Sequence, residues 1–283
     1  MFLFVLGEIY FRYFYIKSDG IGNTIASKNW YKKYWNPINN FGFRDIIWNF
    51  DTKKKKVFIL GDSFIAGSGI QNIQKRISGF LRKKNSINFE YYNIAKPGWD
   101  TKQQIEFINN FPHIPEILIY SYYLNDIGNV EFPKHWYSKN IIIRKSAFIN
   151  YLYWKYKRRD KIMKNFSDKI KYKYLDDKIL LNHFKEINEI IGYTQKNNIK
   201  LIIILFPFLL DLENQSFYIM YDFFKNNAHN YYLINVKEII KKNKIPIKNY
   251  IVNFDDPHPS IILNKKISEE IEEILHRITR HLR

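Results

Sequence analysis

An α/β fold with a mostly parallel sheet of five strands is predicted by the regular alternation of apolar runs and helical stretches along the chain. Five short apolar runs have the length and composition of buried strands: 57–60, 89–94, 117–122, 200–205 and 231–236. Amphipathic helical spacing follows or separates them at 101–110, 178–196 and 264–282. Because strands joined through helices pair in parallel, we expect helices on both faces of the sheet.

The chain of 283 residues is long enough for one sizeable α/β domain. We expect this domain to occupy residues 53–283, preceded by a turn-rich segment at 17–52 that wraps around it. A basic, aromatic insertion at about 129–177 follows the third strand and interrupts the alternation. A surface insertion whose aromatic side chains pack on the domain is the simplest interpretation, and a lid or a membrane-surface element is the alternative.

Residues 1–16 form a hydrophobic N-terminal segment and a possible membrane anchor. Glu8 and Arg12 interrupt this segment, whereas a membrane-spanning helix needs about 20 mostly apolar residues. A signal peptide would require a basic start and a small-residue cleavage site, and neither is clear. A shortened anchor, an interfacial helix and a helix packed on the domain all remain open. A membrane-associated or cell-envelope location is favoured over a cytoplasmic one.

The formal net charge of +18 raises the question of nucleic-acid binding. Lysine, asparagine and isoleucine are abundant throughout the chain, so the charge reflects overall composition, and no nucleic-acid-binding motif is present. We therefore expect no nucleic-acid partner. The absence of cysteine excludes disulfides, a thiolate nucleophile and cysteine-based zinc sites.

A candidate nucleophile, Ser63, directly follows the first predicted strand in the motif GDSFIAGSG. A serine at a strand end, with a helix starting after it, is presented with its backbone N–H pointing outward. A phosphate-binding glycine loop is excluded in detail, because the Walker lysine and the GxGxxG spacing are both missing.

Two further motifs follow the second and third predicted strands. Gly98, in NIAKPGWDT, would point its N–H outward, and Asn125, in SYYLNDI, offers a side-chain amide that can bond a developing oxyanion. Thr101 and Gln104 resemble a capping box that would begin the next helix. Each motif alone is equally compatible with a simple turn.

The last motif, NFDDPHPS, contains a candidate base and its orienting carboxylate. Asp255 and His258 are three residues apart in a proline-stiffened loop, which would let the carboxylate reach one imidazole nitrogen while the other accepts the serine proton. Asp256 is a rival for the carboxylate, and the spacing favours Asp255.

Together these four motifs resemble the blocks of the SGNH, or GDSL-type, hydrolase superfamily over roughly residues 40–280. The resemblance implies a three-layer α/β/α, flavodoxin-like fold and a catalytic triad of Ser63, His258 and Asp255. It also implies an oxyanion hole formed by Ser63, Gly98 and Asn125. One departure is Tyr123, which stands where the family's third block has glycine.

The expected activity is hydrolysis of ester bonds through an acyl-enzyme intermediate, with no metal and no cofactor. The expected substrate is a small-molecule or carbohydrate ester, with removal of acetyl groups from carbohydrate preferred, and a membrane surface is a possible partner. An O-acyltransferase using the same triad and a non-catalytic basic membrane-surface protein are the alternatives.

Overall fold

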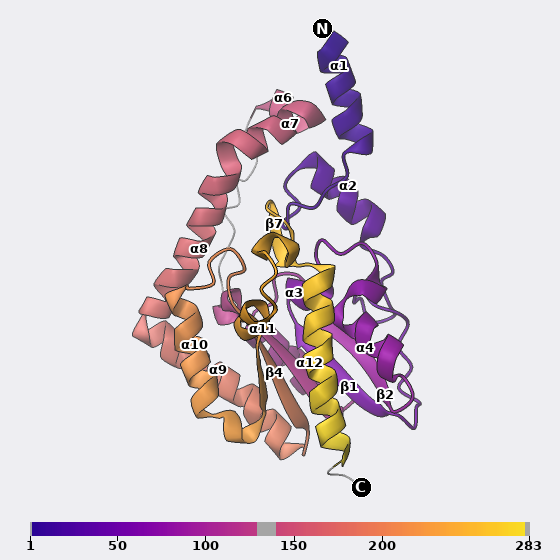
Figure 1. The fold of residues 1–283 in the computed structure, drawn as a ribbon, viewed down its shortest axis with the longest axis vertical. Coiled ribbons are helices and arrows are strands. Elements are labelled where there is room, and N and C mark those ends of the chain that lie inside the picture. Colours follow the sequence, from indigo (N-terminus) through magenta and orange to yellow (C-terminus); the bar gives the residue numbers. More distant parts are fainter. Residues whose placement is uncertain (1, 129–139, 281–283) are drawn as a thin grey trace.

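The computed structural model describes residues 2–128 and 140–280, so residues 129–139 of the predicted insertion lie outside this part (Figure 1). Its central feature is a sheet of five parallel strands in the order β2-β1-β3-β4-β5. The strands are β1 (Lys55–Gly61), β2 (Phe89–Ala95), β3 (Ile117–Tyr123), β4 (Lys200–Phe206) and β5 (Tyr232–Asn235). All five predicted strands are present, and the prediction of a parallel sheet is confirmed.

Helices cover both faces of this sheet and complete a three-layer α/β/α fold (Figure 1). On one face α12 packs against both α4 and α11, and on the other α5 and α10 lie with α9 and the end of α8. Their bounds are α4 (Ile77–Asn85), α5 (Thr101–Asn110), α9 (Asp177–Lys196), α10 (Gln215–Asn226), α11 (Val236–Asn243) and α12 (Ile261–Arg280). A short antiparallel hairpin, β6 (Ile251–Asn253) and β7 (Asp256–Pro259), precedes α12.

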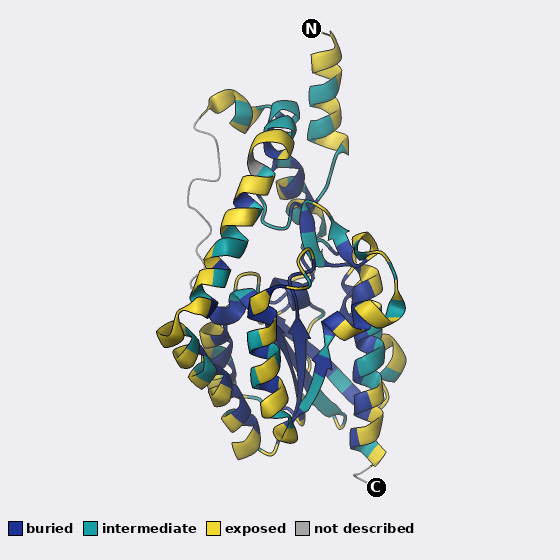
Figure 2. Ribbon diagram, turned by 60° about the vertical axis from the view of Figure 1, so that its left-hand side comes forward, coloured by how far each residue is buried: buried dark blue, intermediate teal, exposed yellow. Residues whose placement is uncertain are grey.

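The central strands are apolar on both sides because both of their faces are covered by helices. Figure 2 shows the middle of the sheet as buried, and Ile59, Ile119, Ile202 and Ile203 are fully buried. This burial is the main favourable contribution to folding.

Helix α5 has the predicted bounds, 101–110, but its capping pair lies one residue earlier than the predicted pair. Its cap is Asp100, whose carboxylate accepts the Gln103 N–H while the Gln103 side chain accepts the Asp100 N–H. The predicted capping pair, Thr101 and Gln104, is fully buried instead, with the Thr101 hydroxyl 3.1 Å from the Tyr120 hydroxyl. The apolar contact with β3 decides which polar residues face solvent and cap the helix.

The N-terminal residues and the insertion form a projection that extends beyond the carboxyl end of the sheet (Figures 1 and 2). Helix α1 (Phe2–Ile9), with the π-helical turn Tyr10–Phe14, packs against α7 (Ala147–Tyr153), and α2 (Ile25–Tyr34) contacts α7 as well. The insertion also contains α6 (Ile141–Lys145), a π-helical turn (Trp154–Arg158) and α8 (Arg159–Leu175), which runs back to the sheet. In the described part of the chain, no helix meets the length and hydropathy needed to cross a bilayer.

A buried carboxylate connects the segment before β1 to the sheet layer. Asp45 accepts hydrogen bonds from Arg76 Nη2 at 3.0 Å, Arg82 Nη1 at 2.8 Å and Trp48 Nε1 at 2.8 Å. Burial by itself would raise the pKa of Asp45, but the two guanidinium groups lower it overall. The carboxylate is therefore charged and compensates two arginines, one of them fully buried.

We predict that Asp45→Asn destabilises the protein by about 3–5 kcal/mol, because it leaves a buried cation without its counter-charge. Urea unfolding with Asp51→Asn as the exposed control measures this loss, and an equal effect of both substitutions would contradict it. Since the pKa of Asp45 is lowered, its stabilisation should be present above the ordinary value of 3.8 and disappear as the pH falls through the folded-state pKa.

Candidate active site

Four segments that are far apart in the sequence meet at the carboxyl edge of the sheet. Ser63, Gly98 and Asn125 follow β1, β2 and β3, and His258 comes from β7. All four line one cavity of about 500 Å³. Carboxyl ends of parallel strands are the usual place for a ligand site in an open α/β sheet.

Ser63 is the first residue of the short helix α3 (Ser63–Ala66). The preceding residue, Asp62, caps this helix by accepting the Phe64 N–H at 2.9 Å, which directs the turn after β1. Glycine is required before it, because a Cβ at Gly61 would lie 2.7 Å from Ile65 Cγ1. The turn is tight, and it leaves the serine hydroxyl at the cavity wall.

A chain of two hydrogen bonds links the serine to a buried carboxylate. His258 Nε2 lies 2.9 Å from Ser63 Oγ, and His258 Nδ1 lies 2.5 Å from Asp256 Oδ1. Asp256 also accepts the backbone N–H of His258 at 3.2 Å and is fully buried. The carboxylate therefore fixes the orientation of the imidazole and favours the tautomer with its proton on Nδ1.

The expectation that Asp255 orients His258 is wrong in this geometry. Asp255 Oδ2 is 2.7 Å from Lys17 Nζ, and its Oδ1 is 3.2 Å from Arg159 Nε. The reason is that 256–259 form a strand, in which residues two apart point to the same side. Asp256 and His258 share one side of β7, and Asp255 precedes the strand and turns the other way.

Gly98 and Asn125 contribute polar groups to the other wall of the cavity. Gly98 has a φ of +81°, and a Cβ there would meet no atom within 4 Å among the described residues, so the space in front of its backbone is open. Asn125 belongs to the 3₁₀ turn Leu124–Ile127, and its side-chain amide lies near the carboxylate of Asp62, whose pKa it lowers. The aspartate before the serine thus caps α3 and lies beside the amide.

Tyr123, which replaces the glycine of the resembling motif, closes the cavity beside the nucleophile. Its ring stacks on Phe64 with a centroid distance of 4.0 Å and meets Phe208 edge-on at 5.6 Å. The ring belongs to the lining of the cavity but contacts neither Ser63 nor His258 through any hydrogen bond described here. The substitution therefore narrows the cavity without occupying the polar wall.

The segment 17–24 forms part of the site, which the motifs did not predict. A Cβ at Gly20, where φ is +79°, would lie 3.1 Å from Asp256 Oδ1 and 3.3 Å from His258 Nδ1. Ser18 lies near Asp256 and lowers its pKa, and Asp19 folds the segment by accepting the Gly22 N–H at 2.8 Å. The pattern SDGIGNT was a signal for such an aspartate-centred turn, but nothing in it indicated contact with residues more than 230 positions away.

The insertion supplies another wall of the cavity through α8. Its residues Met163, Phe166 and Ser167 face the loop after β4, where Phe208 and Leu209 continue the apolar lining. Polar side chains also belong to the lining: the buried Asp19 and Asn23, the half-buried Ser167 and the exposed Asp211. The cavity can therefore hold a molecule with both apolar and polar groups.

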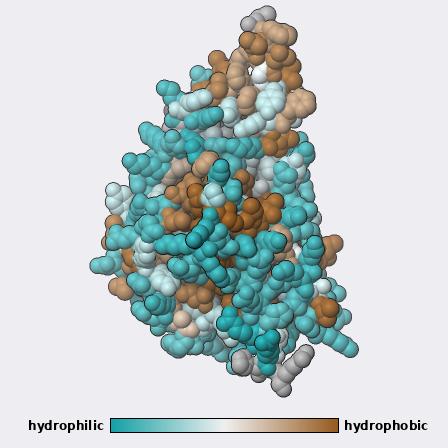
Figure 3. Space-filling view, in the orientation of Figure 1, coloured by the Kyte–Doolittle hydropathy of each residue, from teal (hydrophilic) through white to brown (hydrophobic). Residues whose placement is uncertain are grey.

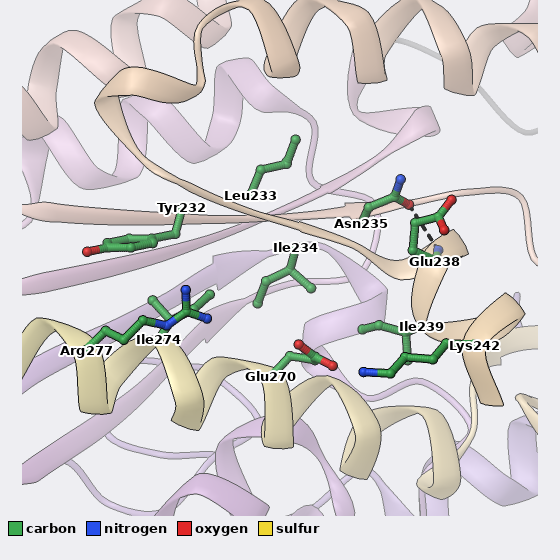
Figure 4. Close-up of a pocket in the computed structure, with 10 residues that line it drawn as sticks. All are labelled: Tyr232, Leu233, Ile234, Asn235, Glu238, Ile239, Lys242, Glu270, Ile274 and Arg277. Atoms are coloured by element: carbon green, nitrogen blue, oxygen red, sulfur yellow. Dashed lines mark hydrogen bonds between the residues drawn. The ribbon is translucent and has the colours of Figure 1, made fainter.

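A second hollow of about 560 Å³ lies at the opposite edge strand, β5, between α11 and α12 (Figure 4). Its lining combines apolar and charged side chains, among them Glu238, Lys242, Glu270 and Arg277, and contains no serine or histidine. Within the described ranges, no group of three or more His, Asp or Glu side chains is arranged to hold a metal ion.

The similarity of this chain to known proteins lies in its fold. No protein-family model and no curated protein sequence matches the chain. Among solved structures, the Clostridium thermocellum family 3 carbohydrate esterase matches at 17% identity with a TM-score of 0.50, covering 81% of this chain and 99% of its own. A protein assigned to the lipolytic G-D-S-L family, from Desulfitobacterium hafniense DCB-2, matches at 12% identity and a TM-score of 0.50, with coverages of 78% and 99%. The chain therefore shares the fold of these two proteins.

We predict that His258 titrates above 6.5, and that its ring NMR signals show this directly. Burial by itself lowers the pKa of His258, but Asp256 and Asp62 raise it overall. Asp256→Asn should lower this pKa, whereas Asp255→Asn, the matched control, should leave it nearly unchanged. Since the pKa of His258 is raised, protonated His258 should stabilise the folded protein. This contribution should be complete below pH 6.5 and disappear as the pH rises through the folded-state pKa. An equal shift in both variants would contradict the geometry.

Proposed function

We propose that this protein is a serine hydrolase that cleaves ester bonds through an acyl-enzyme intermediate. The observation that carries the proposal is the hydrogen-bonded series Ser63 Oγ, His258 Nε2, His258 Nδ1 and Asp256 Oδ1. A nucleophile in contact with a base, and a base held by a buried carboxylate, is the arrangement that activates a serine hydroxyl. The fold shared with esterases supports the same class of reaction.

In the first half of the reaction, Ser63 Oγ attacks the ester carbonyl carbon as His258 Nε2 takes the hydroxyl proton. The Asp256 carboxylate stabilises the resulting imidazolium ion. His258 then donates the proton to the departing alkoxide, which is released as the alcohol. The acyl group remains bound to Ser63.

In the second half, His258 Nε2 removes a proton from water, whose oxygen attacks the acyl carbon. The tetrahedral intermediate collapses with release of the carboxylic acid, and the proton on His258 restores the Ser63 hydroxyl. Each proton that the imidazole takes up is given back within the same half-reaction.

The oxyanion formed in each half needs hydrogen-bond donors placed before the reaction begins. We assign this role to the backbone N–H groups of Ser63 and Gly98 and to the side-chain amide of Asn125. The positive φ of Gly98 and the open space in front of it support its part in this assignment, and the place of Asn125 in the lining of the same cavity supports that of the amide. Asp62 is then a positioning residue, because it holds the turn at Ser63 and lies beside the amide.

The substrate class that fits the cavity is an ester with a compact acyl group and a polar alcohol. The apolar lining from Phe64, Phe166 and Phe208 suits the acyl part, and polar groups of the lining, such as Ser167 and the exposed Asp211, suit a hydroxylated alcohol. One of the structures with this fold is a carbohydrate esterase, which supports a carbohydrate ester as the first substrate to test.

Ser63→Ala should abolish both the hydrolysis of a short-chain aryl ester and labelling by a fluorophosphonate. The reason is that both reactions need the same oxygen nucleophile. The label should be found on Ser63 of the wild-type protein by peptide mass spectrometry. Labelling at another serine, or full activity of the variant, would refute the proposal.

The two neighbouring aspartates give a matched pair of variants. Asp256→Ala should reduce kcat by about 10⁴-fold, because the imidazole loses the carboxylate that orients it. Asp255→Ala should change kcat by less than about tenfold, because this side chain bonds Lys17 and Arg159 instead. Comparable losses in the two variants would contradict the assignment of Asp256.

Asn125→Ala should reduce kcat by about 10²- to 10³-fold with little change in stability, because it removes one oxyanion donor. Asn88→Ala, at the amino end of β2, provides a control asparagine that lies outside the site.

Product analysis with and without an added sugar acceptor distinguishes a hydrolase from a transferase. Free acid in both cases identifies a hydrolase, and an acylated sugar identifies a transferase.

A further inference from the structure

The tip of the projection carries an apolar surface that no other segment within 2–128 and 140–280 covers. We call residues 2–16 and 141–158 the arm. Its most exposed large apolar side chains are Phe2 at 75%, Leu3 at 81%, Phe14 at 72% and Ile141 at 68% of their full accessible areas. Figure 3 shows apolar atoms gathered at this end of the molecule. Contiguous apolar area of this kind marks a site of contact with a partner or a membrane.

Glu8, one of the two charged residues that interrupt the apolar sequence of 2–16, holds the two segments of the arm together. The carboxylate of Glu8 accepts hydrogen bonds from Ser146 Oγ at 2.7 Å and from the backbone N–H groups of Ala147 and Phe148 at 3.0 and 3.1 Å. It thereby caps the N-terminus of α7. Arg12 Nε donates to the same carboxylate at 2.9 Å. Both charged groups of the segment are therefore satisfied within the arm.

Ring contacts fix the relative position of the two segments. Phe11 stacks on Tyr151 at a centroid distance of 4.3 Å and on Phe148 at 5.4 Å, and Phe4 meets Phe148 edge-on at 5.9 Å. Phe4 of α1 and Phe11 of the following turn are thus used for packing inside the arm. Leu3 of α1 and Phe14 at the end of that turn remain exposed.

The exposed charges near this apolar surface are almost all positive. Among residues 140–164 whose exposure is described, the exposed ionisable groups are one acid, Asp160, and the bases Arg144, Lys145, Lys155, Lys157, Lys161 and Lys164. A second copy of the chain would bring the same bases together, which is unfavourable. Apolar side chains combined with bases and exposed tyrosines, such as Tyr13 and Tyr156, match the interface of an anionic lipid bilayer.

We propose that the arm docks on the surface of membranes that contain anionic phospholipids, with α1 and α6 inserted at the level of the headgroups. The exposed isoleucines and phenylalanines enter the apolar boundary, while Arg144 and Lys145 contact lipid phosphates. Helix α8 runs from the arm to the wall of the cavity around Ser63, so docking places this cavity on the membrane side of the molecule.

The test is flotation of the full-length protein with vesicles of phosphatidylcholine alone and of phosphatidylcholine mixed with phosphatidylglycerol. Binding should be stronger to the anionic vesicles and should weaken with added salt. A triple variant with Phe2→Ser, Leu3→Ser and Leu6→Ser should bind at least about tenfold less. The charge variant Arg144→Gln with Lys145→Gln should lose the preference for anionic vesicles but keep its fold, because both side chains are exposed.

The matched control is Lys83→Gln with Ile87→Ser, which removes an exposed base and an exposed apolar residue near the amino end of β2. This variant should bind like the wild type. The proposal is overturned by absence of vesicle binding, by equal binding to neutral and anionic vesicles, or by full binding of both arm variants. A dimer in sedimentation velocity that the triple variant abolishes would assign the surface to a second copy instead. Because flotation measures binding alone, its outcome does not depend on ester hydrolysis.

Discussion

Parallel pairing of the three strands β1, β2 and β3 is the constraint on which the site depends. Gly61 pairs with Ala95, and Leu60 pairs with Tyr120, so the three strands end close together at one edge. A shift of one residue would exchange the two faces of a strand that is buried on both sides and would disrupt the packing of its helices. The loops that carry Ser63, Gly98 and Asn125 are thereby placed side by side by the hydrophobic core.

Assembly of the polar part of the site costs more free energy than assembly of the apolar part, because its carboxylates are buried. Burial raises the pKa of Asp62, although the Phe64 N–H and His258 oppose this effect, and burial together with Asp62 raises that of Asp126. Asp256 remains charged because His258 and hydrogen bonds from its surroundings outweigh its burial. These interactions link the end of β1, the turn after β3, the last hairpin and the segment 17–24 into one network.

In the arm, too, a carboxylate is stabilised by the hydrogen bonds that it accepts. Glu8 would be unfavourable in an apolar helix, and it is stabilised because it satisfies the free N–H groups at the start of α7. Lys17 and Arg159 then meet at Asp255, so the base of the arm and the hairpin that carries His258 are connected by ion pairs. The arm and the site are therefore parts of one structure.

The strands, their parallel pairing and the placement of Ser63, Gly98 and Asn125 after strand ends could be predicted from sequence, because buried strands and the turns after them are local patterns. The motif that contains His258 could be recognised in the same way. The choice of Asp256 over Asp255 could not, since it depends on which residues share a side of a hairpin that forms only against the rest of the site. The packing of residues 17–24 on that hairpin, and of α8 on the cavity, is likewise decided by contacts between distant segments. Local sequence determines how a segment can fold, and only burial in the assembled core determines which of its polar groups meet.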